Sequence, residues 1–252
     1  MHTAFLVAEV LDDPRQEYLD MNRKITKVSL KLPAIGKRRV DTLIEYHSYK
    51  ENVGLKQGDI IQLMDVKIRH NYKTREWWLV GGNIEKRQPP CPPSNYCIFT
   101  GRVMRDIDTS NPMDFRGTES GLMIANCSIS VITGKQESDI IPFVAINSQE
   151  DRYKPAQLLV DMAARKGMGL TIKGCLVTDS WEDKESGEVK FKSQILLKNF
   201  TMAPKNKPQE IQPRAEIPAD AEPKSLWLPA QDTDDDPFWS YTDATRHSSL
   251  SM

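Results

Sequence analysis

The segment CIFTGRVMRDID, from Cys97 to Asp108, carries the strongest fold signal, because a related strand-forming segment, FLVAEVLDDP, stands at Phe5 to Pro14. Each segment is followed by a Lys/Gln-Gly turn that leads into an apolar strand, and then by a hairpin with an aromatic residue near its start. A repeated small β module indicates a repeated binding surface, which favours a long ligand over a small one.

Composition limits the class of protein. With 252 residues, 39% of them hydrophobic and 27% charged, the chain can bury one large core or two modest ones. No apolar run approaches the roughly 18–20 residues of a membrane-spanning helix, and the first residues lack the basic region of a secretory signal. The four cysteines show neither CxxC spacing nor histidines at ligand spacing, which favours reduced thiols. We expect a cytoplasmic protein with no metal and no cofactor.

Charge and proline content divide the chain. Lys and Arg number 16 against 12 Asp and Glu up to Gln88, 13 against 14 from Pro89 to Met202, and 5 against 9 after that. A basic first half and an acidic tail are typical of nucleic-acid contact with an interaction tail, although a neutral protein's solvated surface looks similar. We predict domains at 3–87 and 95–202, a Pro-rich linker at 88–94 and a disordered tail at 203–252.

Most local signals predict strands. In the first domain they are Ala4–Leu11, Ile25–Leu32, Arg39–Tyr46, Asp59–Ile68 and Trp77–Val80, and in the second Cys97–Met104, Leu122–Ile132, Ile140–Ile146, Gly169–Thr178 and Val189–Asn199. An amphipathic helix is predicted at Pro155–Arg165, with Gly167 just beyond its end. Five strands with a helix between the third and fourth follow the order of an OB-fold, so the predicted fold is all-β with two tandem OB-fold barrels.

The second domain resembles the bacterial single-stranded DNA-binding protein family. The resemblance rests on the order of Phe99–Asp106, Arg165-Lys166-Gly167 and the hairpin containing Trp181, with a weaker counterpart in Val7–Pro14 and Lys56-Gln57-Gly58. It implies OB-fold barrels that bind single-stranded DNA. Since that family generally assembles four barrels, two barrels per chain imply a homodimer.

The sequence departs from the family pattern in its expected third strand. That strand carries one aromatic residue, Phe143, and also Pro142, which suits an edge strand and not a central one. We therefore expect the second barrel to rely on Trp181 and Phe191 and to serve more in assembly, with binding concentrated in the first barrel.

Aromatic and basic side chains are the candidate nucleic-acid contacts. Aromatic rings stack on unpaired bases, and Lys and Arg neutralise phosphates. For each aromatic the alternative is core packing, and for Lys37-Arg38-Arg39 it is a solvated loop. Trp77 and Trp78 must point to opposite faces of their strand. The candidates are Lys37, Arg38, Arg39, Tyr46, Lys67, Arg69, Tyr72, Lys73, Arg75, Trp77, Trp78, Arg102, Arg105, Lys173, Trp181 and Phe191.

The tail contains an acidic motif, Asp234-Asp235-Asp236-Pro237-Phe238-Trp239. It resembles the acidic tip through which the family recruits replication and repair proteins, although thirteen residues follow Trp239 here. The acidic run would steer a basic partner and the Pro-Phe would anchor it. The alternative is an acidic solubilising tail.

Catalytic motifs are missing from the sequence, which contains no phosphate-binding loop, HExxH motif or nucleophile elbow. We expect no enzymatic activity. The sequence predicts a nucleoid-associated protein that binds single-stranded DNA without sequence preference in replication, recombination or repair. The alternatives are an RNA-binding or annealing factor and a structural OB module that docks on a protein assembly.

Overall fold

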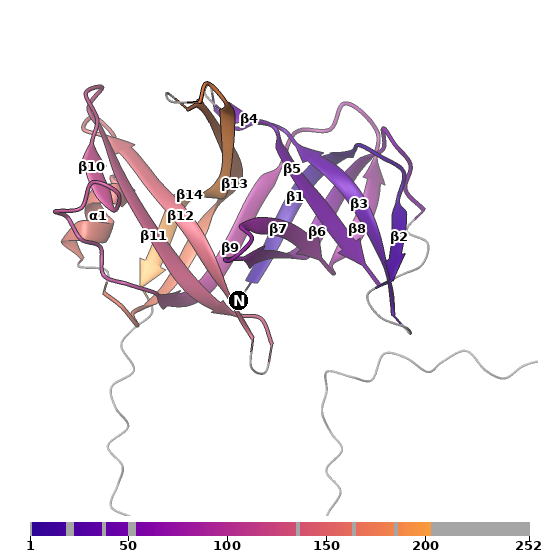
Figure 1. Cartoon of the computed structure of the whole chain (residues 1–252), viewed down its shortest axis with the longest axis horizontal. Helices are drawn as coiled ribbons and strands as arrows, with labels where there is room; N and C mark the ends of the chain where they lie inside the picture. Colours follow the sequence, from indigo (N-terminus) through magenta and orange to yellow (C-terminus); the bar gives the residue numbers. More distant parts are fainter. Residues whose placement is uncertain are drawn as a thin grey trace, which may run out of the picture. The chain divides into compact units, whose positions relative to one another are not determined.

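The structure is a computed structural model that describes residues 2–18, 23–36, 39–49, 54–134, 137–162, 165–183 and 186–202. Its regular structure is nearly all β-strand, arranged as two five-stranded OB-fold barrels (Figure 1), so the predicted fold class is confirmed. The predicted disordered tail with its acidic motif lies outside the described residues, as do Lys37 and Arg38.

The first barrel closes in OB-fold order. Its strands are β1 (His2–Val10), β3 (Lys24–Leu32), β5 (Thr42–Ser48), β6 (Ile60–Asn71) and β7 (Glu76–Val80), with short β2 (Arg15–Tyr18), β4 (Arg39–Val40) and β8 (Asn83–Arg87). β1 pairs antiparallel with β3 and β6, β3 with β5, and β6 with β7, while β5 runs parallel to β7. The alternation in β3 puts Val28, Leu30 and Leu32 inside the barrel, which explains the strand's period-two pattern.

The second barrel repeats this order and adds a helix. Its strands are β9 (Asn95–Val103), β11 (Leu122–Ile132), β12 (Ser138–Ser148), β13 (Gly169–Glu182) and β14 (Val189–Met202), with β10 (Phe115–Gly117) and α1 (Pro155–Asp161) between them. β9 pairs with β11 and β13, and β12 runs parallel to β14. α1 begins at Pro155 as predicted but is shorter, and Gly167 belongs to the turn before β13 and does not end the helix.

The two copies share backbone contacts at the turn before their fourth strand. The amide of Gly58 donates to the carbonyl of Val10 at 2.8 Å, and the amide of Gly167 donates to the carbonyl of Val103, also at 2.8 Å. Both glycines have positive φ, 85° and 83°, a conformation that glycine adopts without a Cβ clash. The predicted correspondence of the two Lys/Gln-Gly turns is therefore confirmed at the level of individual hydrogen bonds.

A carboxylate after the first strand caps each of these turns. Asp13 accepts a hydrogen bond from the amide of Gln57 at 3.0 Å, and Asp106 accepts one from the amide of Lys166 at 2.7 Å. An acidic residue near the end of each repeated segment therefore stabilises the turn that leads into the fourth strand.

Gly101 allows β9 to cross β11 and close the second barrel. A Cβ at this position would lie 2.3 Å from the carbonyl oxygen of Ser130, so the two backbones approach too closely for any side chain. The glycine of the GRV sequence is thus a barrel-closure residue.

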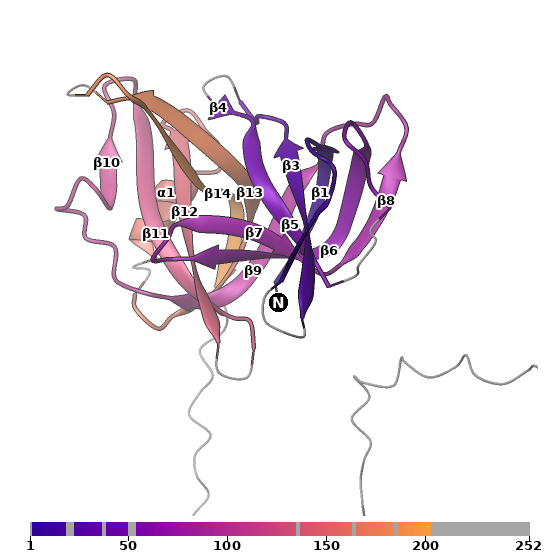
Figure 2. The same ribbon diagram turned by 45° about the vertical axis from the view of Figure 1, so that its right-hand side comes forward.

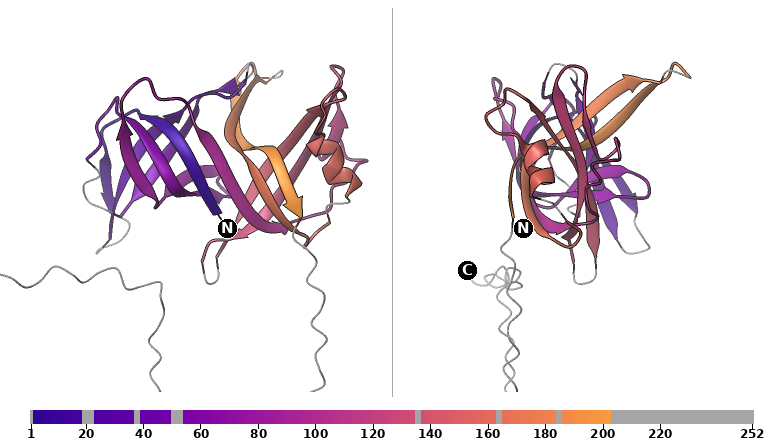
Figure 3. Two further views of the ribbon diagram at one scale, coloured as in Figure 1. Left: turned by 180° about the vertical axis from the view of Figure 1, so that it is seen from behind. Right: turned by 90° about the vertical axis from the view of Figure 1, so that its left-hand side faces the viewer.

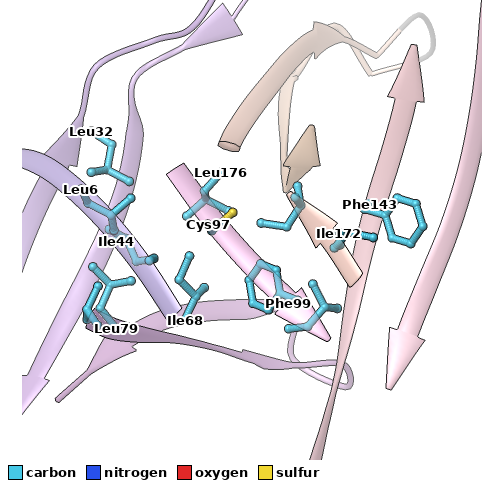
Figure 4. Close-up of a cluster of buried hydrophobic side chains, with 14 of the residues drawn as sticks. Leu6, Leu32, Ile44, Ile68, Leu79, Cys97, Phe99, Phe143, Ile172 and Leu176 are labelled. Carbon is cyan, nitrogen blue, oxygen red and sulfur yellow. The ribbon is translucent and has the colours of Figure 1, made fainter. Parts of the chain in front are cut away.

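The two barrels join through their first strands and through a continuous core. The first five residues of β1 pair antiparallel with the first five of β9, and one apolar cluster runs from Leu6 and Ile44 through Cys97 to Phe99 and Phe143 (Figure 4). The described barrels belong to one compact unit. The predicted division at 3–87 and 95–202 follows the two barrels and stays a proposal.

Pro142 does not lie in an edge strand, and that prediction is wrong. β12 is a central strand that pairs with β11 along its whole length and with β14 at Phe143 and Val144. Because the parallel ladder to β14 covers only these two residues, Pro142 precedes it and needs no N–H on that side.

Two further features concern the class of protein. Within the described ranges, no helix has the length and apolarity that crossing a bilayer requires, and no cluster of metal-ligating side chains is found. Cys97, Cys127 and Cys175 are buried and unpaired, and burial raises the pKa of the Cys127 thiol to about 11. These thiols are therefore poor nucleophiles at neutral pH.

Candidate nucleic-acid interface

The β6–β7 hairpin of the first barrel reaches across to the second barrel (Figure 2). Near its root, Arg69 donates to both carboxylate oxygens of Asp139 on β12, at 2.7 and 3.2 Å. The next residue, His70, donates its backbone N–H to Asp139 at 3.2 Å and its Nδ1–H to the carbonyl of Ile140 at 2.6 Å. The hairpin is therefore fixed to the start of β12 before its tip begins.

The β13–β14 hairpin of the second barrel makes the reciprocal contact. β13 pairs with β4 of the first barrel, where Arg39 Nε donates to Asp179 at 3.0 Å. The hydroxyls of Thr42 and Thr178 are 2.9 Å apart beside it. Arg39, a predicted nucleic-acid contact, is thus largely buried in a junction between the barrels.

Apolar side chains cover part of the outward face of the second barrel. They come from β12, β13 and β14 and form a cluster separate from the barrel core, which Ile35 of the first barrel joins. Its buried members are Val144, Cys175, Val177 and Leu196, and Ile124 and Ile146 flank them. Alternation in β14 places Lys192, Gln194 and Leu196 on this same outward face.

Two cationic side chains from separate elements, Arg75 and Arg116, lie close enough to Lys192 on this face to act on its charge. Protein atoms around Lys192 displace water from its ammonium group and are the largest cause of its lowered pKa; the nearby positive charges of Arg75 and Arg116 lower it further. Asp179 acts in the opposite direction, but its oxygens already accept hydrogen bonds from Arg39 and Gln194. We call Arg75, Arg116 and Lys192 the shared basic surface.

The shared basic surface lacks local neutralisation. Among the described residues, no carboxylate lies within ion-pair distance of these three cations. The Arg116 guanidinium donates to the carbonyl of Pro112, at 3.2 Å, which leaves its charge without a counter-charge in the described part of the chain. Three like charges held together without a counter-charge favour an anionic ligand.

The exposed aromatics of the β13–β14 hairpin lie on opposite faces of the ribbon, which projects from the barrel (Figure 3). Trp181 stands opposite Lys190 and therefore shares a face with Lys192, whereas Phe191 stands opposite Ser180 on the other face. Their exposed fractions are 46% and 63%. Only Trp181 lies on the face of the shared basic surface.

The outward face of the first barrel is covered by an ion-pair network. Glu45 contacts Arg15 at 3.2 Å, Lys27 at 3.7 Å and His47 at 3.1 Å, and Glu17 contacts Lys27 at 2.8 Å. The hydrogen bond that Lys27 donates to Glu17 is the main reason why the pKa of Lys27 is raised. The pKa of Lys31 on β3 is raised in the same way by its hydrogen bond to Glu9 of β1.

The predicted aromatic contacts of the first barrel separate into inner and outer residues. Tyr46 is a core residue with 4% exposure, so its ring cannot stack on a base. Trp77 faces the core and contacts the His70 ring in a tilted arrangement, with 4.3 Å between the ring centroids, while Trp78 faces outward, as the strand alternation predicts. Arg69 lies over the Trp78 ring at 5.8 Å, so this indole is already in contact with a cation.

The other predicted residues are exposed, and two of them have local partners. Arg105 pairs with the buried Asp114, and Arg102 donates to the carbonyl of Gly167 at 3.0 Å. The remaining exposed ones are Lys67 on β6, Lys173 on β13, and Tyr72, Lys73 and Arg75 at the tip of the β6–β7 hairpin. Of the predicted residues that the structure describes, Arg75 and Trp181 join the face that also carries Lys192.

Arg116 and Lys192 were not among the predicted contacts. The alternation of Lys190, Phe191 and Lys192 could have indicated a cationic face of β14, with Lys198 further along it. Nothing local in the sequence connects this face with Arg75, because the tertiary contact of the β6–β7 hairpin brings them together.

Comparison with known proteins bears on the fold. No protein-family model and no curated protein matches the sequence. The chain is similar to a deletion mutant of the single-stranded DNA binding protein from Thermus aquaticus, with a TM-score of 0.62 and 18% identity over 83% of this chain and 98% of the other. The likeness establishes the fold. The wild-type form of that protein gives a TM-score of 0.57 and 17% identity, over 83% of this chain and 96% of the other.

Proposed function

We propose that this chain binds single-stranded DNA without sequence preference. The observation that carries the proposal is the convergence of Arg75, Arg116 and Lys192 beside an outward face that also presents Trp181. OB-folds bind extended oligonucleotides on such faces and on the loops beside them. The likeness to the Thermus aquaticus protein, which is named for this activity, agrees with the proposal.

The chemistry of the surface fits a flexible anionic strand. Three cations without carboxylate partners can each release a counterion when a phosphate binds, and a stacked base contributes roughly 1–3 kcal/mol on an exposed ring such as Trp181. Stacking and phosphate contacts do not distinguish bases, so we expect little sequence preference. The surface offers no arrangement suited to catalysis, and we propose a binding protein and not an enzyme.

The biological role follows from this binding mode as a proposal. The protein would protect exposed strands in replication, recombination or repair, close to the nucleoid. A homodimer would bring four barrels together. Asp234–Trp239 would recruit partner proteins, although this motif lies outside the described residues.

Tryptophan fluorescence titrated with oligo-dT tests the proposal. We expect oligo-dT to quench the fluorescence and the affinity to fall as salt rises. The shared basic surface alone should give a slope of about −2 in a plot of log affinity against log salt. Quenching should be smaller in Trp181→Phe. Tighter binding of oligo-rU would favour the RNA alternative. The absence of binding to either polymer at low salt would overturn the proposal and favour a protein-docking OB module.

A further inference from the structure

The contact between the β6–β7 hairpin and β12 has the geometry of a positioning device. Asp139 accepts three hydrogen bonds from the hairpin, two from Arg69 and one from the backbone N–H of His70. Its side chain is only 8% exposed. Two parallel bonds from a guanidinium to one carboxylate fix direction as well as distance, so this contact restricts how the hairpin leaves the first barrel.

The other side of the hairpin root is held by packing. His70 is buried, its Nδ1–H donates to the carbonyl of Ile140, and its ring contacts the ring of Trp77, which packs against the core. Burial is the main cause of the lowered pKa of His70, which keeps the ring neutral and able to make this single donation at neutral pH. The root is therefore fixed to both barrels at once.

The tip of the hairpin follows directly from this root. Asn71 ends β6, and the backbone N–H of Arg75 donates to its carbonyl at 2.7 Å, which closes a tight turn. Tyr72 and Lys73 are exposed within that turn. A rigid root and a closed turn together hold the backbone of Arg75 in place, and its charge acts on Lys192 of β14.

We propose that Asp139, through Arg69 and His70, is a positioning residue that makes the β6–β7 hairpin of the first barrel part of the strand-binding surface of the second barrel. One single strand is then held by both barrels of the same chain in a continuous path. This inference rests on the proposed function. Asp139 itself is buried and does not contact the strand.

Rigid linkage explains why the contact matters for affinity. Once the strand is bound to the second barrel, a hairpin already held in place contributes its phosphate contact without further ordering. A released hairpin samples many directions, so its contribution falls. We expect Asp139→Asn to weaken oligo-dT binding about 5–10-fold and to lower the salt slope by about 0.7, which corresponds to one phosphate contact.

A double-substitution cycle separates positioning from general damage. Arg75→Ala is measured in the wild-type chain and in Asp139→Asn, and we expect a clear loss in the first and little loss in the second. Trp181→Ala serves as the matched partner within the second barrel, and its effect should be the same in both backgrounds. Asp59→Asn is the control for Asp139→Asn, because Asp59 accepts from Lys86 and from the amide of Lys56 within the first barrel.

The outcomes distinguish the two proposals. If Arg75→Ala and Asp139→Asn are additive while oligo-dT still binds, the positioning role is wrong and the proposed function stands. If the wild-type chain does not bind oligo-dT, the proposed function fails. Thermal unfolding checks that each variant is folded, and Arg69→Lys, which keeps the charge but loses the paired geometry, replaces Asp139→Asn if that variant does not fold.

Discussion

The outward faces of the two barrels are built from strands in the same order, but the lysines on them have opposite electrostatic environments. On the first barrel, Arg15, Lys27 and His47 surround Glu45, and attraction to carboxylates raises the pKa of Lys27. Beside the second barrel, Lys192 lies near other cations, and its pKa is lowered. The first face is neutralised within the protein, whereas the second keeps positive charge available for an external anion.

This difference shows why an inventory of residues does not locate a binding surface. The first domain is the richer in aromatic and basic residues, which favoured it as the binding domain. Tyr46 lies in its core, Trp78 contacts Arg69, and Arg39 and Arg69 join the two barrels. Its hairpin tip instead lies toward the second barrel, so our proposed surface belongs to both.

The largest expected effect comes from removing the shared basic surface. We expect the combined variant Arg75→Ala, Arg116→Ala and Lys192→Ala to lose about two units of salt slope and about 100-fold in oligo-dT affinity at 0.1 M salt. Fluorescence titration over a range of salt concentrations measures both quantities.

The control for that variant removes the same charge from the other face. Arg15→Ala, Lys27→Ala and Lys31→Ala together should change the affinity by no more than about threefold, because screening at 0.1 M salt limits the effect of distant charges. Equal losses in the two variants would contradict the distinction between the faces.

A smaller effect separates the two faces of the β13–β14 ribbon. Trp181→Ala should weaken binding at least about fivefold, in line with the loss of one stacked base, and Phe191→Ala should change it less than about twofold. Titration of a dye-labelled oligo-dT avoids dependence on the tryptophan signal. A larger loss from Phe191→Ala would move the binding site to the opposite face of the ribbon.

The junction between the barrels should depend on pH. The ring of His2 in β1 contacts the ring of Phe99 in β9, with 5.0 Å between their centroids, and burial lowers the pKa of His2 to about 4. In the unfolded chain His2 binds a proton below about pH 6.5, whereas in the folded chain it binds one only below about pH 4. Stability is therefore complete above pH 6.5 and is lost as the pH falls, by about 1 kcal/mol at pH 5.5.

Urea unfolding of the wild-type chain and His2→Gln at pH 7.5 and 5.5 measures this loss. Between pH 7.5 and 5.5 the free energy of unfolding should fall by about 1 kcal/mol less in His2→Gln than in the wild-type chain. An identical loss in both proteins would show that His2 does not carry the effect.

The smallest effect tests the neutralisation of the first face directly. Glu45→Gln removes the carboxylate that contacts Arg15, Lys27 and His47. We expect oligo-dT affinity to rise roughly twofold at low salt, since exposed ion pairs contribute little and the released cations are solvated. A decrease in affinity would mean that Glu45 supports a binding site on this face.

The sequence predicted the fold well because the relevant signals are local. The alternation in Ile25–Leu32 and Leu122–Ile132, and the turn glycines at Gly58 and Gly167, depend on nearest neighbours along the chain. Pro142 was misjudged because its tolerance depends on where the ladder to β14 begins, which only the tertiary pairing determines.

The candidate site was predicted less completely. Residue type identified Arg75 and Trp181 as potential contacts, but Arg39, Arg69 and Arg105 have the same chemistry and are paired with buried or partly buried carboxylates. Which arginine finds an internal partner depends on contacts between residues far apart in the chain. No local pattern contains that information.

Lysine acetylation with and without oligo-dT tests the central claim most directly, because it reports which face the strand covers. In the free protein, the lowered pKa of Lys192 and the raised pKa values of Lys27 and Lys31 should make Lys192 the fastest of the three to react. Oligo-dT should protect Lys192 and Lys73 and leave Lys27 and Lys31 unchanged. Protection of Lys27 and Lys31 with continued reaction of Lys192 would contradict the account.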